Sequence, residues 1–446
     1  MRLYNTLSRK KKEFKSIKDG EVGIYYCGMT LQEAPHVGHM RAALTSDILN
    51  RYLRYLGFKV KLVVNFTDID DKVLLKAKEE KRDFREVTSY YEEEYRKASN
   101  ALNILRPSFY PRATQHIKEI IELIEKLLNK DFGYEVDGNV FFRVRSFKPY
   151  GKLSGKKLDD LRSGARIAVD KKKKDPLDFA LWKAAKPGEP YWFSPWGKGR
   201  PGWHIECSAM AIHHLGETID IHGGGGDLMF PHHENEIAQS EAATGKEFAN
   251  YWVHNAMLNI KGEKMSKSLQ NFIPINELYE EFNANTIRLY LLQAHYRKQL
   301  NYNRDMLKQA SSGWEHIKVF LDRTKGLEGK PIGSYLEGFE GNMNDDLGTP
   351  GAIALAFDLV SRGNEASSDE KGAYRETLLF ILDSLGFRVE EEESIKLGEV
   401  LERILALRDS LREEGNYKMA DRVRAVLLEA GIAVEDTKEG TSWRAD

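Results

Sequence analysis

The stretch of this sequence that most constrains its fold is a strand–loop–helix–strand pattern near its start. Residues 22–29 (VGIYYCGM) are mostly apolar, which indicates a buried strand. After a turn segment, residues 40–57 repeat apolar side chains at helical spacing and stop at a glycine. Residues 59–68 (KVKLVVNFTD) then indicate a second strand. Two strands joined through a helix open a parallel sheet, so we expect the α/β fold class with a Rossmann-like domain.

The rest of the chain changes composition several times. Its 446 residues are enough for about three domains. Short strands, a lysine run, glycines and prolines interrupt the α/β pattern, and from about residue 275 the pattern is almost entirely helical. We therefore expect the parallel-sheet domain in two halves at 1–114 and 201–258, an insertion at 115–200, a loop region at 259–304, a helical bundle at 305–395 and a small C-terminal module at 396–446.

Composition excludes several classes of protein. Hydrophobic residues make up 41% and charged residues 30%, which fits a protein with real hydrophobic cores and a polar surface. The formal net charge of -1 excludes a polycation, so any binding of nucleic acid would depend on a local basic face. Two cysteines, Cys27 and Cys207, are too few for a disulfide framework. The basic N-terminus has no apolar run behind it, and no window approaches the ~18 apolar residues of a membrane span. We expect a reducing, cytoplasmic setting and no membrane association.

A histidine motif follows the first predicted strand. His36, Gly38 and His39 (HVGH) lie where the first helix should begin, and the positive end of a helix favours phosphate. The two imidazoles share a face, and the glycine lets a ligand approach the backbone. Two surface histidines at a helix start would give the same pattern, so this motif alone is weak.

A lysine motif lies between the last predicted strand and the helical region. Lys264 and Lys267 (KMSKS, 264–268) are separated by small or flexible residues and can reach a triphosphate from a mobile loop. Positioned cations of this kind stabilise the charge of departing pyrophosphate. An ordinary lysine-rich loop is the alternative.

A third stretch, residues 222–236 (HGGGGDLMFPHHENE), fits a phosphate cradle, a metal site or a polar loop. His232 and Glu236 are four residues apart, hence on one face of a helix start. Nitrogen, sulfur and oxygen ligands together suit zinc. The residues themselves do not choose between His232 and His233, or between Glu234 and Glu236.

Taken together, the histidine and lysine motifs resemble the signature pair of class I aminoacyl-tRNA synthetases. The resemblance extends over nearly the whole chain and is most specific for cysteinyl-tRNA synthetases. The matching stretches are 25–30 (YYCGMT), 65–72 (NFTDIDDK), 104–117 (ILRPSFYPRATQHI), 199–210 (GRPGWHIECSAM), 222–240, 264–268 and 440–444 (GTSWR). The resemblance implies a monomer that activates L-cysteine with ATP to cysteinyl-adenylate and transfers it to the 3′ end of tRNA(Cys).

The same resemblance implies one zinc ion. Its ligands would be Cys27, Cys207, His232 and Glu236, which include the only two cysteines of the chain. An apolar pocket separates small substrates by only ~1–3 kcal/mol. A thiolate is a far better zinc ligand than a hydroxyl, so a metal–sulfur bond would select cysteine over serine without an editing domain. His233 and Glu234 then become supporting residues.

The resemblance also implies roles for further residues. Phosphate charge would be neutralised by His36, His39, Lys264 and Lys267, with Mg²⁺ accompanying ATP. The adenylate site would add Gly38, Gly223, Gly224, Gly225 and Asp227, and the amino-acid pocket Thr67, Trp203 and His222. For tRNA, region 259–304 would contact the stem, the bundle at 305–395 would bind tRNA, and the module at 396–446 would bind the anticodon. Asp436 and Trp443 would contact bases. Phosphates would be contacted by Arg288, Arg297 and Lys298. Trp203 and Trp443 would alternatively be packing residues.

Three positions, Met29, Pro35 and Gln270, depart from the commonest family text, and we expect them to affect loop geometry more than activity. Other functions fit less of the sequence. A mycothiol-pathway ligase would share the zinc site and both nucleotide motifs but lack the terminal module. A zinc hydrolase with Glu234 or Glu236 as general base leaves both nucleotide motifs unexplained. An inactive RNA-binding homologue should have lost a ligand or a motif lysine, and this chain has kept them.

Overall fold

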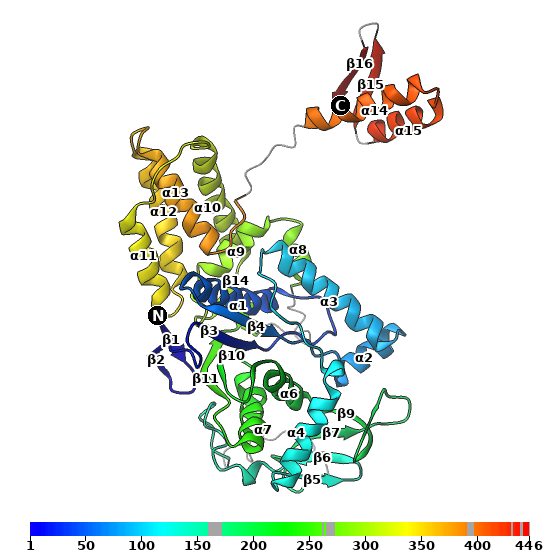
Figure 1. Cartoon of the computed structure of the whole chain (residues 1–446), viewed down its shortest axis with the longest axis vertical. Helices are drawn as coiled ribbons and strands as arrows, with labels where there is room; N and C mark the ends of the chain where they lie inside the picture. The colour runs from blue at the N-terminus through cyan, green and yellow to red at the C-terminus, as the bar shows by residue number, and fades with distance from the viewer. Residues whose placement is uncertain are drawn as a thin grey trace. The chain divides into compact units, whose positions relative to one another are not determined.

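The computed structural model describes residues 1–158, 172–260, 263–264, 273–389, 397–429, 431–437 and 440–445. It divides the chain into two units, Met1–Arg388 and Val389–Asp446, each of which is described by itself (Figure 1). The finer domain boundaries suggested by the sequence stay predictions.

A parallel four-stranded sheet lies at the centre of the first unit. The strand order is β11 (Ala249–Asn255), β10 (Ile219–Gly225), β3 (Glu21–Tyr26) and β4 (Lys59–Val64). All three pairings are parallel. Helix α1 (Val37–Tyr55) covers one side of this sheet, and α6 (Trp203–Leu215) and α7 (Glu234–Thr244) cover the other (Figure 1). The predicted α/β class and its Rossmann-like sheet are confirmed, and the carboxyl ends of all four strands meet at one edge, where such sheets bind ligands.

Helices and a second sheet separate β4 from α6. The helices are α2 (Asp71–Glu80), α3 (Phe84–Ala101) and α4 (Ile117–Asn129), with 3-10 turns at Ala113–Gln115 and Val144–Ser146. The second sheet is antiparallel, in the order β5 (Gly133–Val136), β6 (Asn139–Phe142), β7 (Phe179–Ala184), β9 (Gly197–Pro201), β8 (Trp192–Ser194). Helix α4 buries Ile120, Leu123, Ile124 and Leu127 at helical spacing and packs against α6 and α7.

The chain begins with a hairpin that the sequence analysis did not predict. Strands β1 (Arg2–Asn5) and β2 (Lys10–Glu13) pair in antiparallel register. The hairpin is anchored beside β11, because the N–H of Thr6 donates to the carbonyl of Trp252 at 2.9 Å. The Asn5 side chain donates to the carbonyl of Asn250 at 2.7 Å. The basic patch at the N-terminus is therefore part of the folded unit.

Beyond β11 the chain becomes mainly helical, as predicted. A small sheet of β12 (Leu258–Ile260), β13 (Glu263–Lys264) and β14 (Leu300–Tyr302) comes first. The helices are α8 (Ile275–Tyr279), α9 (Ala284–Leu292), α10 (Arg304–Arg323), α11 (Gly333–Asn344), α12 (Thr349–Glu365) and α13 (Lys371–Ser384).

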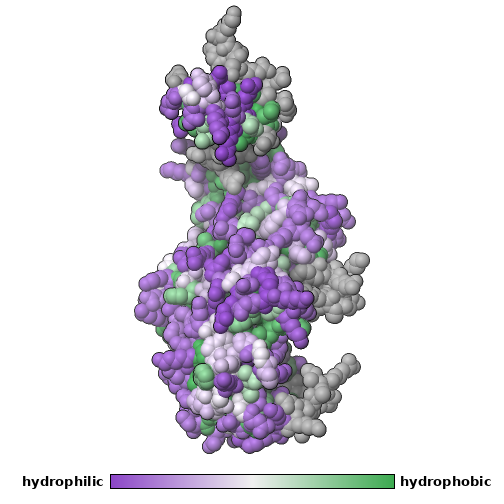
Figure 2. Space-filling view, turned by 90° about the vertical axis from the view of Figure 1, so that its right-hand side faces the viewer, coloured by the Kyte–Doolittle hydropathy of each residue, from purple (hydrophilic) through white to green (hydrophobic). Residues whose placement is uncertain are grey.

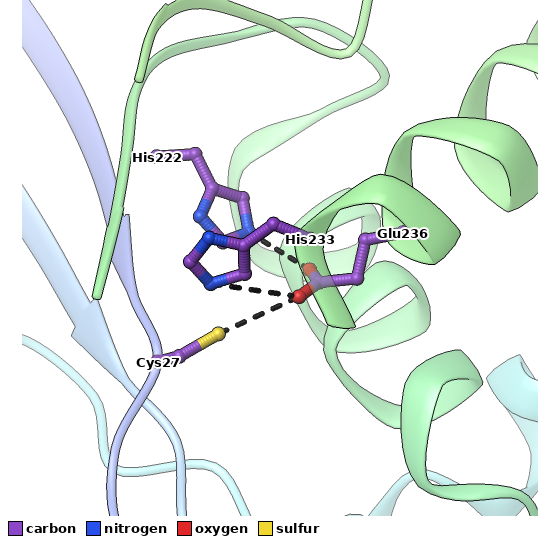
Figure 3. Close-up of side chains that lie close together, drawn as sticks. All are labelled: Cys27, His222, His233 and Glu236. Carbon is purple, nitrogen blue, oxygen red and sulfur yellow. Dashed lines mark hydrogen bonds and ion pairs between the residues drawn. The ribbon is translucent and has the colours of Figure 1, made fainter. Parts of the chain in front are cut away.

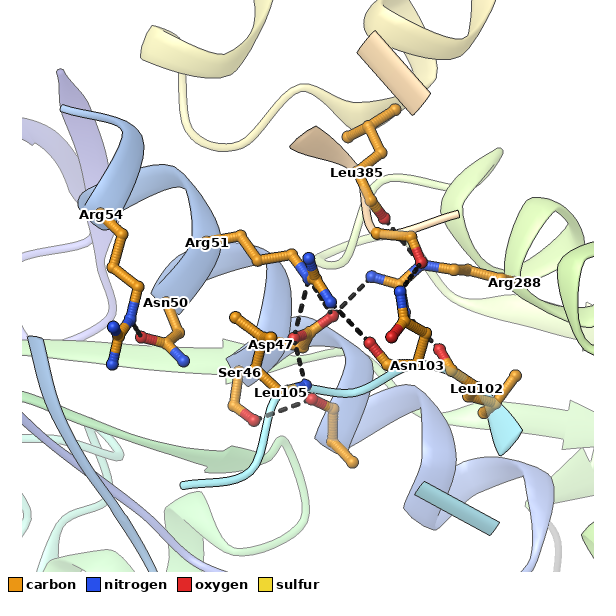
Figure 4. Close-up of polar contacts among 12 residues, drawn as sticks. Ser46, Asp47, Asn50, Arg51, Arg54, Leu102, Asn103, Leu105, Arg288 and Leu385 are labelled. Atoms are coloured by element: carbon orange, nitrogen blue, oxygen red, sulfur yellow. Dashed lines mark hydrogen bonds and ion pairs between the residues drawn. The ribbon is translucent and has the colours of Figure 1, made fainter. Parts of the chain in front are cut away.

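A buried ion pair joins the central sheet's first helix to this helical region (Figure 4). Arg288 of α9 is 1% exposed and lies 2.5 Å from the carboxylate of Asp47, a fully buried residue of α1. The same guanidinium donates to the carbonyls of Leu385 and Leu102 at 2.7 and 2.5 Å. Arg51 also binds Asp47, at 3.0 Å. Because every contact is internal, the expectation that Arg288 meets tRNA phosphate is wrong; it fixes α1 to α9 and to the end of α13.

The second unit has its own small core. Helices α14 (Leu397–Glu413) and α15 (Tyr417–Glu429) precede an antiparallel hairpin of β15 (Ile432–Thr437) and β16 (Gly440–Ala445). Its core is formed by Leu401, Leu405, Leu427 and Val434. Among the described residues, no helix has the length and apolar character needed to cross a membrane. On the face of the molecule in Figure 2, hydrophilic side chains predominate and apolar ones form small separate groups.

Candidate active site and metal centre

A cavity of about 320 Å³ opens at the carboxyl ends of the central strands. Its walls come from the loop after β3, the start of α1, the ends of β4 and β11, the start of α6 and the segment after β10. It brings together residues that are far apart in the sequence. The predicted site residues that line it are Cys27, His36, Gly38, His39, Thr67, Trp203, Cys207, Gly225, Asp227 and His232.

The two motif histidines begin helix α1 and cap it reciprocally. The N–H of His39 donates to Nδ1 of His36 at 3.2 Å, and the N–H of His36 donates to Nδ1 of His39 at 3.3 Å. The rings stack with centroids 3.6 Å apart. Since Nδ1 of each ring accepts a hydrogen bond, the proton of the neutral ring is on Nε2. Each imidazole is therefore held as a donor through Nε2–H.

Burial also keeps both imidazoles uncharged. It lowers the pKa of His36 to about 4, although Glu33 and Asp227 pull in the other direction. Burial, reinforced by the neighbouring His36, lowers the pKa of His39 well below its ordinary value. The sequence analysis expected the pair to neutralise phosphate charge. In this geometry the two neutral rings place Nε2–H donors beside the positive end of α1, an arrangement suited to phosphate oxygens, and their role toward ATP stays a prediction.

The lysine motif is described only in part. The backbone of Lys264 pairs with Asn259 across β13 and β12. Lys267 and Gln270 lie outside the described residues. Where the description resumes, the chain is bonded to the histidine motif: the N–H of Ile275 donates to the carbonyl of Pro35 at 3.0 Å, and the N–H of Val37 donates to that of Ile273 at 3.3 Å. The described segment that follows the lysine motif is thus connected to the start of α1 through backbone hydrogen bonds, and Pro35 takes part in the connection.

The four residues expected to bind zinc converge beside this cavity. Their ligand atoms lie within 4.8 Å of one another, and all four residues are buried. The two sulfur atoms are 3.8 Å apart, and Sγ of Cys27 is 3.5 Å from Oε1 of Glu236. Nε2 of His232 is 3.0 Å from the same oxygen.

These distances fit a metal ion. For tetrahedral zinc with bonds of about 2.3 Å to sulfur and about 2.0 Å to oxygen, neighbouring ligand atoms are roughly 3.8 Å (S–S) and roughly 3.5 Å (S–O) apart. The observed sulfur–sulfur and sulfur–oxygen separations have these values. Two thiols, an imidazole and a carboxylate are also a donor set that zinc prefers. The residues present therefore fit the ion that the sequence suggested.

A second grouping replaces Cys207 and His232 by His222 and His233 (Figure 3). His222 lies 2.8 Å from Oε2 of Glu236, and His233 lies 3.9 Å from Oε1. Nδ1 of His233 is 2.8 Å from Nε2 of His254, so this ring belongs to a chain of internal hydrogen bonds. The grouping with both thiols supplies the softer ligands and is the better zinc site.

Two further histidines contact the side chains of the expected metal ligands. His222 was predicted to line the amino-acid pocket, but it is fully buried, is not among the residues that line the cavity, and orients Glu236. His204, which the sequence analysis did not single out, has Nδ1 2.9 Å from Nδ1 of His232. Partners of this kind fix the orientation of metal ligands. His222 lies within β10, which is buried along nearly all of its length, and the need of a polar side chain there for a partner was the available signal.

The protonation of the cluster favours a bound cation. Burial raises the pKa of Cys207, but hydrogen bonding from Cys27 and the neighbouring His232 outweigh it and lower that pKa to about 6. Burial, together with the Cys207 thiolate, raises the pKa of Cys27 well above its ordinary value. The two shifts run in opposite directions, so one thiol of the pair ionises more easily than the other. A divalent ion would allow both sulfurs to ionise.

Several other expectations need correction. Gly223 and Gly224 do not face the cavity, because a Cβ there would meet the Tyr26 ring at 2.4 Å and the His233 ring at 2.9 Å. Gly223 leaves room for the ring of Tyr26 in β3, and Gly224 leaves room for the ring of His233 just before α7. Arg297 is 32% exposed and binds Asp346 at 2.6 Å within the first unit, so its contact with tRNA phosphate stays a prediction. Lys298 is exposed, so its contact with tRNA stays a prediction.

The anticodon residues are described only at the level of the backbone. Asp436 pairs with Thr441, and Trp443 pairs with Val434 in the β15–β16 hairpin. Val434 is one of the buried core residues of the second unit. Contacts of Asp436 and Trp443 with tRNA bases stay predictions.

Comparison with known proteins agrees with this architecture. Residues 13–312 match the family described as tRNA synthetases class I (C) catalytic domain, and residues 338–388 match the DALR domain. Among solved structures, this chain is similar to a Mycobacterium tuberculosis methionyl-tRNA synthetase in complex with methionyl-adenylate. The two share 14% sequence identity and a TM-score of 0.58, over 82% of this chain and 89% of that chain. A putative arginyl tRNA synthetase from Campylobacter jejuni shares 12% identity over 84% of this chain and 95% of that chain, with a TM-score of 0.57. These two likenesses show the fold, and the family match spans well over half of the sequence. The chain therefore belongs to the class I aminoacyl-tRNA synthetases, enzymes that activate an amino acid with ATP and transfer it to tRNA.

Proposed function

We propose that this class I synthetase is specific for cysteine and forms cysteinyl-tRNA(Cys). One observation carries the proposal. Cys27, Cys207 and His232 line the same cavity as His36 and His39, and together with Glu236 they form a buried group that could hold a metal ion. A synthetase that holds a thiophilic ion beside its ATP motif is suited to a substrate with a thiol. The designation class I (C) of the matching family model supports the same specificity.

The amino-acid side of the pocket would be organised around the metal. A bound zinc ion would supply a coordination position for the substrate sulfur and the positive charge that favours its thiolate form. Glu236 is held by His222 at 2.8 Å, and His232 by His204 at 2.9 Å, so both ligands are oriented before substrate binds. The ring of Trp203 lies 4.3 Å from that of His232 and closes one side of the small pocket. Thr67 lines the same cavity.

On the nucleotide side, His36 and His39 would donate from Nε2–H to phosphate oxygens of ATP. Asp227 would accept from the ribose. The carboxylate of cysteine then attacks the α-phosphorus, and pyrophosphate departs with its charge stabilised by Lys264, Lys267 and Mg²⁺. A hydroxyl of the terminal adenosine of tRNA next attacks the carbonyl carbon, and AMP leaves. No protein nucleophile is required.

The decisive experiment is ATP–pyrophosphate exchange driven by cysteine, serine, alanine or methionine, with zinc quantified in the same preparation. We expect exchange with cysteine alone and one zinc in this site. Cys27→Ser should lose that zinc and cysteine-dependent exchange together. ATP binding measured in the same variant is the control, because His36 and His39 are untouched.

The possible failures are distinct. Exchange that is better with methionine or serine would overturn the specificity. Cysteine-specific exchange without zinc would overturn the role of the metal. Cysteine activation without charging of tRNA(Cys) would point to a different acceptor.

A further inference from the structure

We propose that His116, His213 and His214 form a second metal site, separate from the active site, that binds a divalent transition ion, with zinc the first candidate. His116 immediately precedes helix α4, and the other two histidines are in the last turn of α6. One ring nitrogen from each of the three lies within 4.8 Å of the others. The proposal does not depend on which amino acid the enzyme activates.

The arrangement of the three rings fits imidazoles that bind one common metal ion. Nε2 of His116 and Nε2 of His214 are 3.1 Å apart. Two imidazole nitrogens on one ion, each at about 2.0–2.1 Å, are separated by roughly 3.0–3.4 Å. The ring of His213 completes the group, with its centroid 4.8 Å from that of His214 and 5.4 Å from that of His116.

Hydrogen bonding prepares His116 to bind metal. Its Nδ1 is 2.8 Å from the carbonyl oxygen of Arg112. A carbonyl only accepts, so Nδ1 carries the proton, and in the neutral ring Nε2 keeps its lone pair, directed at His214. Histidine ligands in metal sites commonly donate their other N–H to a carbonyl or carboxylate in this way.

A carboxylate accompanies a second member of the group. Oε1 of Glu119 is 3.5 Å from Nδ1 of His213. This carboxylate can orient the ring or occupy a further position on the ion. Three imidazoles with one nearby carboxylate suit zinc, nickel or copper better than calcium or magnesium.

The nearby positive charge of Lys61 does not prevent the three histidines from binding a metal ion. Lys61 is the opposing cation, but its ammonium donates to the carbonyl of His214 at 2.6 Å and lies over the ring of Phe109. His214 also stacks on Phe109, and without an ion its Nε2–H can donate to the lone pair on Nε2 of His116, a hydrogen bond that a bound ion would replace.

A bound ion would have a structural consequence. Helix α6 carries Cys207 of the proposed active-site zinc, and its last turn carries His213 and His214. The ion would link that last turn to the start of α4. We therefore expect metal to raise the thermal stability of the folded unit by binding the native state only.

The test counts metal ions on the intact protein. Enzyme loaded with its active-site zinc is dialysed against micromolar free Zn²⁺, and bound zinc is measured by mass spectrometry. We expect two ions per chain for the wild type, and one for His213→Ala/His214→Ala. His316→Ala is the matched control, because His316 is an exposed histidine of α10 outside every metal-binding group of the described residues, and it should keep two.

Two further variants separate this site from the active site. Cys27→Ser should lose the active-site zinc yet keep the ion at the three histidines. The single change His213→Ala should weaken the second ion by more than about tenfold, since even losing a supporting partner of a ligand costs about 10–100-fold. Added zinc should raise the melting temperature of His316→Ala as much as that of the wild type, and should raise that of His213→Ala/His214→Ala less. A wild type that holds one ion at saturating zinc, or a double variant that still holds two, would overturn the proposal.

Discussion

Replacing Arg288 by methionine should destabilise the first unit by about 3–5 kcal/mol, the range for removing one partner of a buried ion pair. Asp47 is fully buried, and in the variant it would lose its contact at 2.5 Å. The carbonyls of Leu385 and Leu102 would also lose a donor, which adds to the cost. Arg51 remains at 3.0 Å from Asp47 and limits the loss.

Urea unfolding followed by tryptophan fluorescence measures this change. The matched control is Arg362→Met on α12, where a side chain 64% exposed pairs with Asp358 at 3.0 Å. An exposed pair of this kind contributes little to stability because water screens it. The contrast between two arginine-to-methionine changes isolates the effect of burial.

A second measurement addresses the alternative role in tRNA binding. A side chain that neutralises one phosphate changes the slope of log K against log salt by about 1. Arg288→Met should leave that slope unchanged, since the guanidinium has only internal partners. A variant with wild-type stability and a reduced salt slope would refute the reasoning and return Arg288 to the tRNA surface.

Three other changes test the rest of the molecule. His222→Gln should weaken active-site zinc by about 10–100-fold in chelator competition while ATP affinity stays constant, because this ring orients Glu236; an equal loss of ATP affinity would contradict it. Because burial lowers the pKa of His36 to about 4, the unfolded chain binds a proton that the folded chain lacks between about pH 6.5 and 4. Stability should therefore fall on acidification through this window by up to about 1.4 kcal/mol per pH unit, and less steeply in His36→Asn, which keeps a helix cap; identical slopes would argue against the buried neutral ring. Deleting 396–446 should impair tRNA charging and spare amino-acid-dependent exchange; unchanged charging would remove the anticodon role of that segment.

Local patterns predicted the central sheet well because each element has its own signature. The strand–helix–strand unit at 22–68 is the β3–α1–β4 unit of the structure. The antiparallel sheet between β4 and α6 was harder to predict. Short strands were expected in this region, but the pairing of β6 with β7 depends on residues far along the chain. The N-terminal hairpin was missed for the same reason, since its short strands are held by contacts with β11.

The site was predictable where function requires particular residues in a short motif. His36, His39 and the two cysteines were found from sequence, and the cavity brings them together. Spacing did not separate His232 from His233, because adjacent residues at a helix start are distinguished only by what surrounds them. Nor can sequence reveal that an arginine is buried: Arg288 and Asp47 are 241 positions apart, and only the fold shows that they meet.

The Arg288 cluster also limits how this enzyme can be recombined. A side chain at Gly386 would lie 2.2 Å from the guanidinium, and its backbone has a φ of +73°, so that position suits glycine alone. A chimera that joins the catalytic part to a foreign helical domain would have to reproduce both this glycine and the neighbouring carbonyl of Leu385. The match to the catalytic family ends at residue 312. Helix α1 nevertheless depends on residues near 385, because its Asp47 binds Arg288 and Arg288 donates to the carbonyl of Leu385. Exchange of whole domains at the family boundary should therefore fail more often than substitution within either part.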